Sequence, residues 1–104
     1  CASKAGVVGL MRCVALEGAP HGVTCNSISP TWVNTQFGRE WMGDIAQNQE
    51  GREGEQYIAD AEAANPQGRL IEPSEIGGLA RYLCSDEAAG MTMQDLTVAA
   101  GSLW

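Results

Sequence analysis

Ala2-Ser3-Lys4-Ala5-Gly6-Val7-Val8-Gly9-Leu10-Met11-Arg12-Cys13-Val14-Ala15-Leu16-Glu17 is the stretch that decides the fold of this chain of 104 residues. Its apolar residues recur at i, i+3, i+4 and i+7, which predicts a helix over residues 2–17. That stripe comprises Val7, Leu10, Met11 and Val14. A second stripe is made of small residues, namely Ala2, Gly6, Gly9 and Cys13. A helix that is apolar or small on most sides is usually buried on more than one side. We therefore expect one side to meet a sheet and another to meet a second subunit.

The rest of the chain alternates between strand and helix signals. Residues 23–29 are rich in β-branched side chains and nearly uncharged, which predicts a strand that Pro30 stops. An irregular loop is expected over 31–39 and a polar helical excursion over 40–64. Pro73 then starts a helix running to about residue 84, and 96–99 form a last short strand. This order predicts an α/β fold, as half of a sandwich of helices on a sheet.

The charge balance excludes two classes of partner. The chain has 13 Asp and Glu residues against 6 Lys and Arg residues, a formal net charge of -7. Nucleic acids and anionic membrane surfaces reward clustered cations, so neither is expected as a partner. No apolar run approaches the roughly 18 residues that are needed to span a bilayer.

The four cysteines are Cys1, Cys13, Cys25 and Cys84. None belongs to a Cys-x-x-Cys pair, and the single His21 has no partner at metal-ligand spacing, so no metal site is expected. Because the last three cysteines stand among apolar residues, we expect them to be buried and reduced. Reduced thiols favour a cytoplasmic protein.

Four segments together resemble the short-chain dehydrogenase/reductase family. They are Ala2-Ser3-Lys4, Asn26-x-Ile28-x-Pro30, Asn65-Pro66-x-Gly68-Arg69 and Thr92-x-Gln94-x-Leu96-x-Val98. Their order and spacing match over essentially the whole chain. The resemblance implies that residues 1–104 are the C-terminal part of a single NAD(P)-binding domain, half of a Rossmann-like doubly wound parallel sheet that is incomplete as given. In that pattern residues 36–64 occupy the place of the substrate lid.

The resemblance assigns Lys4 to the catalytic Tyr-x-x-x-Lys pair, which puts the tyrosine one residue before Cys1. Lys4 would hydrogen-bond the nicotinamide ribose hydroxyls and stabilise the tyrosinate, because a nearby cation lowers the pKa of a phenol from its ordinary value near ~10. The implied reaction interconverts a secondary alcohol and a ketone with NAD or NADP, as in 3-oxoacyl reductases. No G-x-G-x-x-G pattern occurs in the sequence, and the position that selects NAD or NADP is not in it.

Pro30-Thr31-Trp32-Val33-Asn34-Thr35 resembles the family's Pro-Gly-x-Val-x-Thr loop, which implies cofactor contacts at Pro30, Val33 and Thr35. Thr35 could instead be an ordinary loop hydroxyl or a helix cap. Three positions depart from the family, because Thr31, Met93 and Ala100 stand where it has glycine. A side chain is costly at such a position if the backbone needs a positive φ.

Two further roles concern the lid and the segment that follows it. Four large side chains either line a substrate pocket or form the core that holds the lid, namely Trp32, Phe37, Trp41 and Met42. Arg69 is expected to make a structural ion pair near the helix that starts at Pro73, with no catalytic role.

Two functions of different classes follow. In the first, the chain is part of an NAD(P)-dependent oxidoreductase that acts on a small alcohol or ketone, active at full length and inactive as 104 residues alone. In the second, it is a catalytically silent assembly or interaction module. A homo-oligomer, dimer or tetramer, is expected through helix 2–17 and the C-terminal strand.

Overall fold

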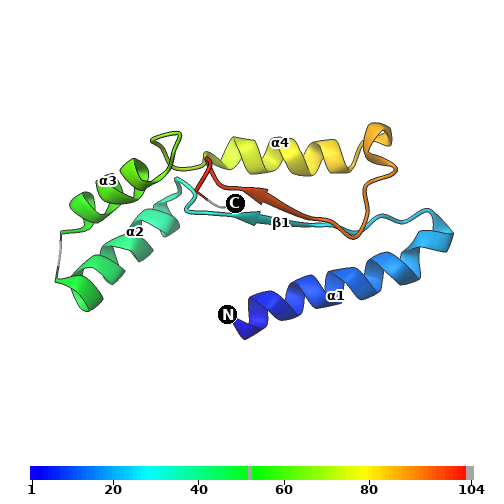
Figure 1. Cartoon of the computed structure of the whole chain (residues 1–104), viewed down its shortest axis with the longest axis horizontal. Helices are drawn as coiled ribbons and strands as arrows, with labels where there is room; N and C mark the ends of the chain where they lie inside the picture. Colours follow the sequence, from blue (N-terminus) through cyan, green and yellow to red (C-terminus); the bar gives the residue numbers. More distant parts are fainter. Residues whose placement is uncertain (52, 103–104) are drawn as a thin grey trace. The chain divides into compact units, whose positions relative to one another are not determined.

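The computed structural model describes residues 1–51 and 53–102. Helices and short strands alternate along the chain (Figure 1), which confirms the α/β class. The elements are α1 (Ala2–Gly18), η1 (Ala19–His21), β1 (Ser27–Pro30), α2 (Gln36–Ile45), the π-helical turn η2 (Ala46–Glu50), α3 (Gly54–Ala64), α4 (Pro73–Leu83), η3 (Asp86–Ala88) and β2 (Asp95–Val98).

The chain divides into two compact units. Residues 1–29 and 77–97 form the first unit, and residues 30–76 with the described residues from 98 onward form the second. The strands and α4 continue from one unit into the other, because their residue ranges cross these boundaries.

The two strands pair in parallel. In the first unit the Ser27 N–H donates to the Gln94 carbonyl oxygen at 2.9 Å, and in the second the Thr31 N–H donates to the Val98 carbonyl oxygen at 3.1 Å. The prediction of a strand from residue 23 was wrong at its start. The Cys25 N–H donates to the Thr92 side-chain oxygen instead of to a neighbouring strand, so the ladder begins only at Ser27. The last strand lies one residue earlier than predicted.

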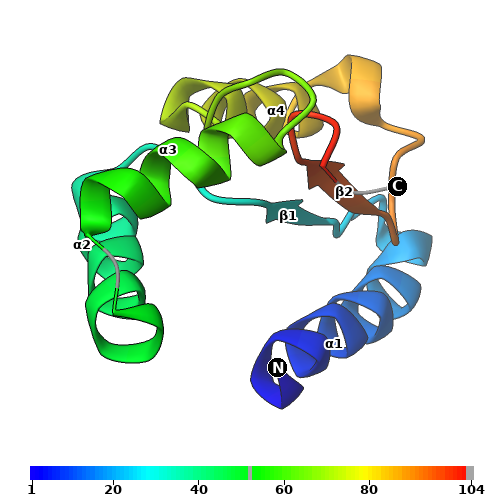
Figure 2. The same cartoon turned by 60° about the vertical axis from the view of Figure 1, so that its left-hand side comes forward.

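Alternation along β1 sends its side chains to opposite faces of the sheet. In the first unit the Ser27 and Ser29 hydroxyls both donate to Asp95 Oδ1, each at 2.7 Å. Hydrogen bonds from Ser29 first and then Ser27 hold the pKa of Asp95 below its ordinary value. Figures 1 and 2 show α1 and residues 77–83 of α4 on opposite sides of the two strands.

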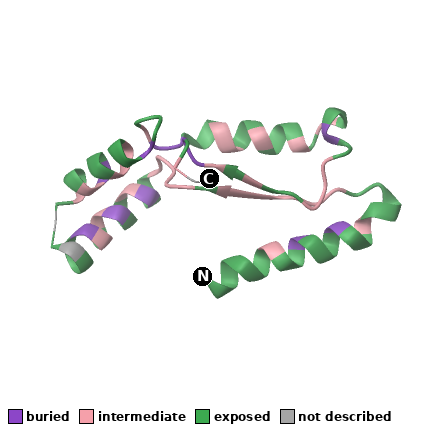
Figure 3. Ribbon diagram, in the orientation of Figure 1, coloured by how far each residue is buried: buried purple, intermediate pink, exposed green. Residues whose placement is uncertain are grey.

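The predicted helix over residues 2–17 is confirmed, but its predicted burial on several sides is wrong for this chain (Figure 3). Only Met11 and Ala15 are buried, whereas Val7 is 58% exposed and Leu10 is 65% exposed. The reason is that no described segment covers the outer faces of α1.

The prediction of buried cysteines is wrong as well. Cys13 on α1 and Cys84 after α4 are exposed, and Cys25 is half-buried. Cys1 is exposed too, and all four thiols are free.

In the second unit α2 and α3 lie side by side, and their contact forms a small core (Figure 2). Met42, Ile58 and Leu70 are buried there, and Trp32, Tyr57 and Ala61 pack against them. The loop expected over 31–39 is shorter than predicted. Thr35 caps α2, its side-chain oxygen accepting from the Gly38 N–H at 2.9 Å, so helix begins at Gln36.

The expected ion pair of Arg69 is confirmed. Its guanidinium donates to both carboxylate oxygens of Glu75, at 2.6 and 2.8 Å, within the first turn of α4. This hydrogen bond, followed by one from the Glu72 N–H, lowers the pKa of Glu75 to about 2. The pair ties the segment after α3 to the start of α4.

Two of the three positions that replace family glycines have left-handed backbone. Met93 has a φ of 62° and Ala100 a φ of 50°, and they are the two such non-glycine positions among the described residues. Thr31 is not among them, so the expected strain applies to two positions and not to the third.

Candidate functional site

The candidate site lies where the strands end. Parallel α/β sheets bind ligands outside the carboxyl ends of their strands, and here β1 ends at Pro30 and β2 at Val98. The loop after Pro30 is held by an isolated parallel bridge between Val33 and Ile71. In it the Ile71 N–H donates to the Trp32 carbonyl at 3.1 Å, and the Asn34 N–H donates to the Ile71 carbonyl at 2.7 Å.

Because of this bridge, the backbone N–H and carbonyl of Val33 point away from Ile71. In an extended chain successive peptide groups alternate in direction, so if Trp32 and Asn34 bond to Ile71, the Val33 groups point away from it. The Val33 carbonyl accepts from the Thr35 N–H at 2.8 Å, whereas the Val33 N–H makes no hydrogen bond within residues 1–51 and 53–102. An unpaired backbone N–H at this edge is a ready donor for a ligand carbonyl.

Thr35 supports the same loop. Its oxygen is occupied as an acceptor by the Gly38 N–H, so the helix-cap interpretation is confirmed. Its O–H can still donate, because a hydroxyl is both a donor and an acceptor. Whether it contacts a cofactor stays a prediction.

Gly38 and Asn34 belong to this arrangement, and sequence reasoning missed both. A β-carbon at Gly38 would lie 2.6 Å from the Val33 carbonyl oxygen, so only glycine lets α2 approach the loop this closely. The Asn34 side chain donates to Glu72 Oε1 at 3.0 Å and accepts from Arg39 Nε at 2.6 Å. No local sequence signal marks either residue, because the Thr35 cap uses only the backbone N–H of position 38.

A hollow of about 500 Å³ adjoins the end of β1 within the second unit, lined by Pro30, Thr31, Trp32, Asn65 and Ser102. The hydroxyl oxygen of Thr31 is buried and has no hydrogen-bond partner. Among residues 1–51 and 53–102 it is the one buried side-chain oxygen or nitrogen in this state. Of the predicted cofactor residues, Pro30 ends β1, and Val33 and Thr35 belong to the loop after it, all within the second unit.

Lys4 lies in the first unit, in the first turn of α1. It is exposed, and within the part of the chain that the structure describes it makes no hydrogen bond or ion pair. Its ammonium is thus available to a partner outside these residues, and its catalytic role stays a prediction.

The structure divides the four large side chains, Trp32, Phe37, Trp41 and Met42, between the two interpretations. Met42 is fully buried and Trp32 packs against its cluster, so these two form the core of the second unit. Phe37 is 75% exposed and Trp41 53% exposed. Those two can line a binding surface.

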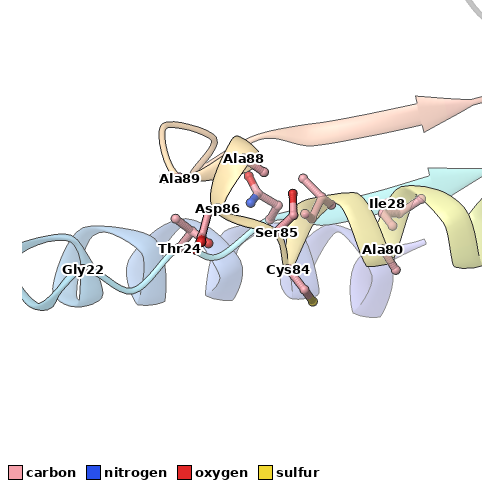
Figure 4. Close-up of a pocket in the computed structure, with 11 residues that line it drawn as sticks. Gly22, Thr24, Ile28, Ala80, Cys84, Ser85, Asp86, Ala88 and Ala89 are labelled. Atoms are coloured by element: carbon pink, nitrogen blue, oxygen red, sulfur yellow. The ribbon is translucent and has the colours of Figure 1, made fainter.

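A second hollow, of about 490 Å³, lies within the first unit (Figure 4). Residues from Gly22 to Ile28 form one wall, and the end of α4 with η3 forms the other. Its polar lining includes Asn26, Ser85 and Asp86. The Asn26 amide already donates to the Met91 carbonyl and accepts from the Gln94 N–H. None of the predicted site residues lines it.

The described residues contain no group of three or more His, Cys, Asp or Glu that could hold a metal ion. No helix among them combines the length and the apolar character needed to cross a membrane.

The parallel strands, the flanking helices and the loop at the strand ends define a Rossmann-like α/β protein. The family model described as enoyl-(acyl carrier protein) reductase matches residues 1–102. The chain belongs to this family, within the short-chain dehydrogenases/reductases, which confirms the resemblance seen in the sequence.

Relatives and solved structures agree with the family. The chain is 39% identical over 103 residues to 2,3-dihydro-2,3-dihydroxybenzoate dehydrogenase of Escherichia coli, covering 97% of this chain and 40% of that protein. It is 32% identical over 102 residues to an NAD-dependent glycerol dehydrogenase of Listeria innocua, and the match covers 97% of this chain and 35% of that protein. Among solved structures it resembles an actinorhodin polyketide ketoreductase crystallised with NADPH, with a TM-score of 0.88 and 35% sequence identity. The match covers 97% of this chain and 38% of the ketoreductase. The chain thus spans well under half the length of these proteins.

Proposed function

We propose that this chain is the C-terminal part of an NAD(P)-dependent oxidoreductase that interconverts a secondary alcohol and a ketone. The observation that carries the proposal is the unpaired Val33 N–H, held outward at the strand ends by the bridge to Ile71. The whole of residues 1–104 would be one part of a single domain, with 36–64 as its lid. Relatives that are named as dehydrogenases and a ketoreductase support the reaction class.

The residues of the loop fit a nicotinamide cofactor, because a carboxamide offers the acceptor that the Val33 N–H lacks. Such a cofactor supplies or accepts the hydride when it is bound. Val33 would orient the carboxamide, Pro30 would fix the backbone that leads into the loop, and the Thr35 O–H would donate to the carboxamide or to a phosphate. NAD and NADP share the carboxamide and the bridging phosphates to which this loop would bind, so the loop would not select between them.

Lys4 would act on a different part of the same cofactor, donating hydrogen bonds to the ribose hydroxyls. Its positive charge would also lower the pKa of a tyrosine phenol one residue before Cys1. That phenol could then exchange a proton with the substrate oxygen near neutral pH. Lys4 makes no competing contact among the described residues, which supports this role.

A chimera tests the proposal. The 40% of the Escherichia coli dehydrogenase that matches this chain is replaced by residues 1–102, and the rest of that protein is kept. We expect NADH or NADPH to bind and a secondary alcohol or ketone to turn over. Lys4→Ala should lose most turnover, whereas Arg81→Ala, which changes an exposed cation on α4, should not. A folded chimera in which Lys4→Ala is as active as the parent would refute the role of Lys4.

A second candidate function, a catalytically silent assembly module, is favoured by one observation. Several apolar side chains of α1 are exposed, namely Val7, Leu10, Val14 and Leu16. Titrating the chimera with NADH and NADPH, beside the 104-residue chain alone, separates the candidates, because a silent module binds neither. We expect no binding by the chain alone and saturable binding by the chimera; a chimera that folds yet binds neither favours the module.

The same exposed face supports a homo-oligomer, a dimer or tetramer, through α1 and the C-terminal strand. Sedimentation of the active chimera would test it, and Leu10→Glu should dissociate the oligomer. A monomeric active chimera would contradict it. We also propose a cytoplasmic location and a small-molecule substrate, supported by four free thiols and by the dehydrogenase relatives.

A further inference from the structure

One face of the lid carries a groove that none of the proposed redox residues uses. It has a volume of about 250 Å³ and is lined by Trp41, Asp44, Ile45, Asn48 and Gln49. These residues come from α2 and from η2, the π-helical turn that follows it. Single π-helical turns occur often at functional sites, because the wider turn re-aims side chains along one helix face.

The polar groups of the groove are unoccupied. Within the described parts of the chain, Asp44, Asn48 and Gln49 make no side-chain hydrogen bond or ion pair. The neighbouring carboxylate of Glu40, one turn earlier on α2, accepts a hydrogen bond from Gln36 Nε2 at 2.9 Å. The carboxylate that lines the groove is therefore the one left free for a ligand.

The aromatic side of the groove is also open. Trp41 is 53% exposed and stacks on Phe37, with ring centroids 6.3 Å apart and an angle of 24° between the planes. The faces of aromatic rings carry partial negative charge and attract cations, most strongly at tryptophan. Residues 36–64 add to this field, with seven Asp or Glu against two Arg in the sequence.

From the free carboxylate, the open indole face and the acidic surroundings together, we infer that this groove binds a small organic cation, an amine or quaternary ammonium with an apolar body. Asp44 would pair with the charge, Trp41 would cover it with its ring face, and Ile45 would contact the apolar part. The amides of Asn48 and Gln49 would accept or donate at the rim. This inference stands independently of the proposed redox function, because it uses neither Lys4 nor the loop of residues 30–35.

Choline and its uncharged isostere 3,3-dimethyl-1-butanol provide the test, since they differ in charge and hardly in shape. Each is titrated into the ¹⁵N-labelled 104-residue chain without a nicotinamide cofactor, and the indole N–H signals of the three tryptophans are followed. Trp41→Phe assigns the Trp41 signal. We expect choline to shift that signal saturably and the alcohol to shift it far less, with the difference shrinking as salt is raised.

Asp44→Asn should weaken choline binding by about twofold to fivefold, the range of an exposed ion pair, because the cation–π contact with Trp41 stays. Glu40→Gln is the matched control, because it removes the same charge from the same helix outside the groove. Far-UV circular dichroism checks that both variants keep the helix content of the parent. Equal binding of the two ligands, no shift at Trp41, or equal effects of the two variants would each overturn the inference. Because no cofactor is present, these outcomes are independent of the chimera assays.

Discussion

Gly38→Ala should destabilise the start of α2, because the chain closes tightly there. The new β-carbon would lie 2.6 Å from the Val33 carbonyl oxygen and 3.0 Å from Thr35 Oγ1. Real β-carbons hardly ever approach another heavy atom closer than 3.0 Å, and the nearest atom is backbone, so the loop or the helix must move.

The expected magnitude combines three effects. Displacing the Thr35 cap costs about 1 kcal/mol, and overpacking costs typically about 1–3 kcal/mol. Alanine gains back up to about 1 kcal/mol over glycine in a helix. We therefore expect a net local destabilisation of about 1–3 kcal/mol. Gly43→Ala is the matched control in the same helix, because a β-carbon there meets nothing within 4 Å, and it should stabilise α2.

Hydrogen exchange of the amides in α2 measures both variants. In Gly38→Ala they should exchange roughly 5- to 150-fold faster than in the parent, and in Gly43→Ala more slowly. In the chimera, Gly38→Ala should also weaken cofactor binding, because it moves the Val33 backbone, whereas Gly43→Ala should not. Equal protection of α2 in the two variants would show that the close approach of Gly38 to Val33 does not restrain the loop.

Three further predictions follow from the backbone, the buried hydroxyl and the ion pair. Met93→Gly and Ala100→Gly should each stabilise the protein by about 0.5–1 kcal/mol in urea denaturation. Glycine avoids the roughly 1–2 kcal/mol of left-handed strain, and its larger unfolded-state entropy offsets part of that gain. A loss of stability in either variant would contradict this. Thr31→Val should raise the melting temperature, because it removes an unpaired buried hydroxyl at a gain of about 1 kcal/mol, and Thr31→Ser should not. The Glu75 pKa lies below its ordinary value of 4.5, at about 2, so the folded state favours the charged form; its contribution to stability is present above pH ~4.5 and is lost as the pH falls toward ~2. Glu75→Gln should remove that part of the acid sensitivity in denaturation curves measured from pH 6 to 2, and an unchanged acid slope would contradict the assignment.

The sequence predicted the elements whose signals are local. The helices over α1 and α4 follow from apolar spacing and from Pro73 at a helix start, and both are confirmed to within a residue or two. Strand β1 was predicted four residues too early because β-branched composition does not reveal where a partner strand begins. Here residues 91–94 turn before β2, so Cys25 and Asn26 bond to Thr92 and Met91 outside any ladder.

The sequence patterns predicted more buried side chains than the structure has. The apolar stripe of α1 and the cysteines among apolar residues predicted buried side chains, yet Leu10, Cys13 and Cys84 are exposed. A pattern shows that a face is suited to burial, whereas the chain segments that pack on it decide whether burial occurs.

The sequence by itself therefore determined the family, the α/β class and the ion pair of Arg69, because motif order and helical periodicity depend only on which residues stand near one another along the chain. Only the tertiary structure decided which groups of the loop are free to bind. The Val33 N–H, which has no partner within residues 1–51 and 53–102, points away from Ile71 because that residue, far along the chain, takes the hydrogen bonds on either side of it. The need for glycine at position 38 and the place of the exposed Trp41 beside Asp44 likewise depend on distances that no local pattern fixes.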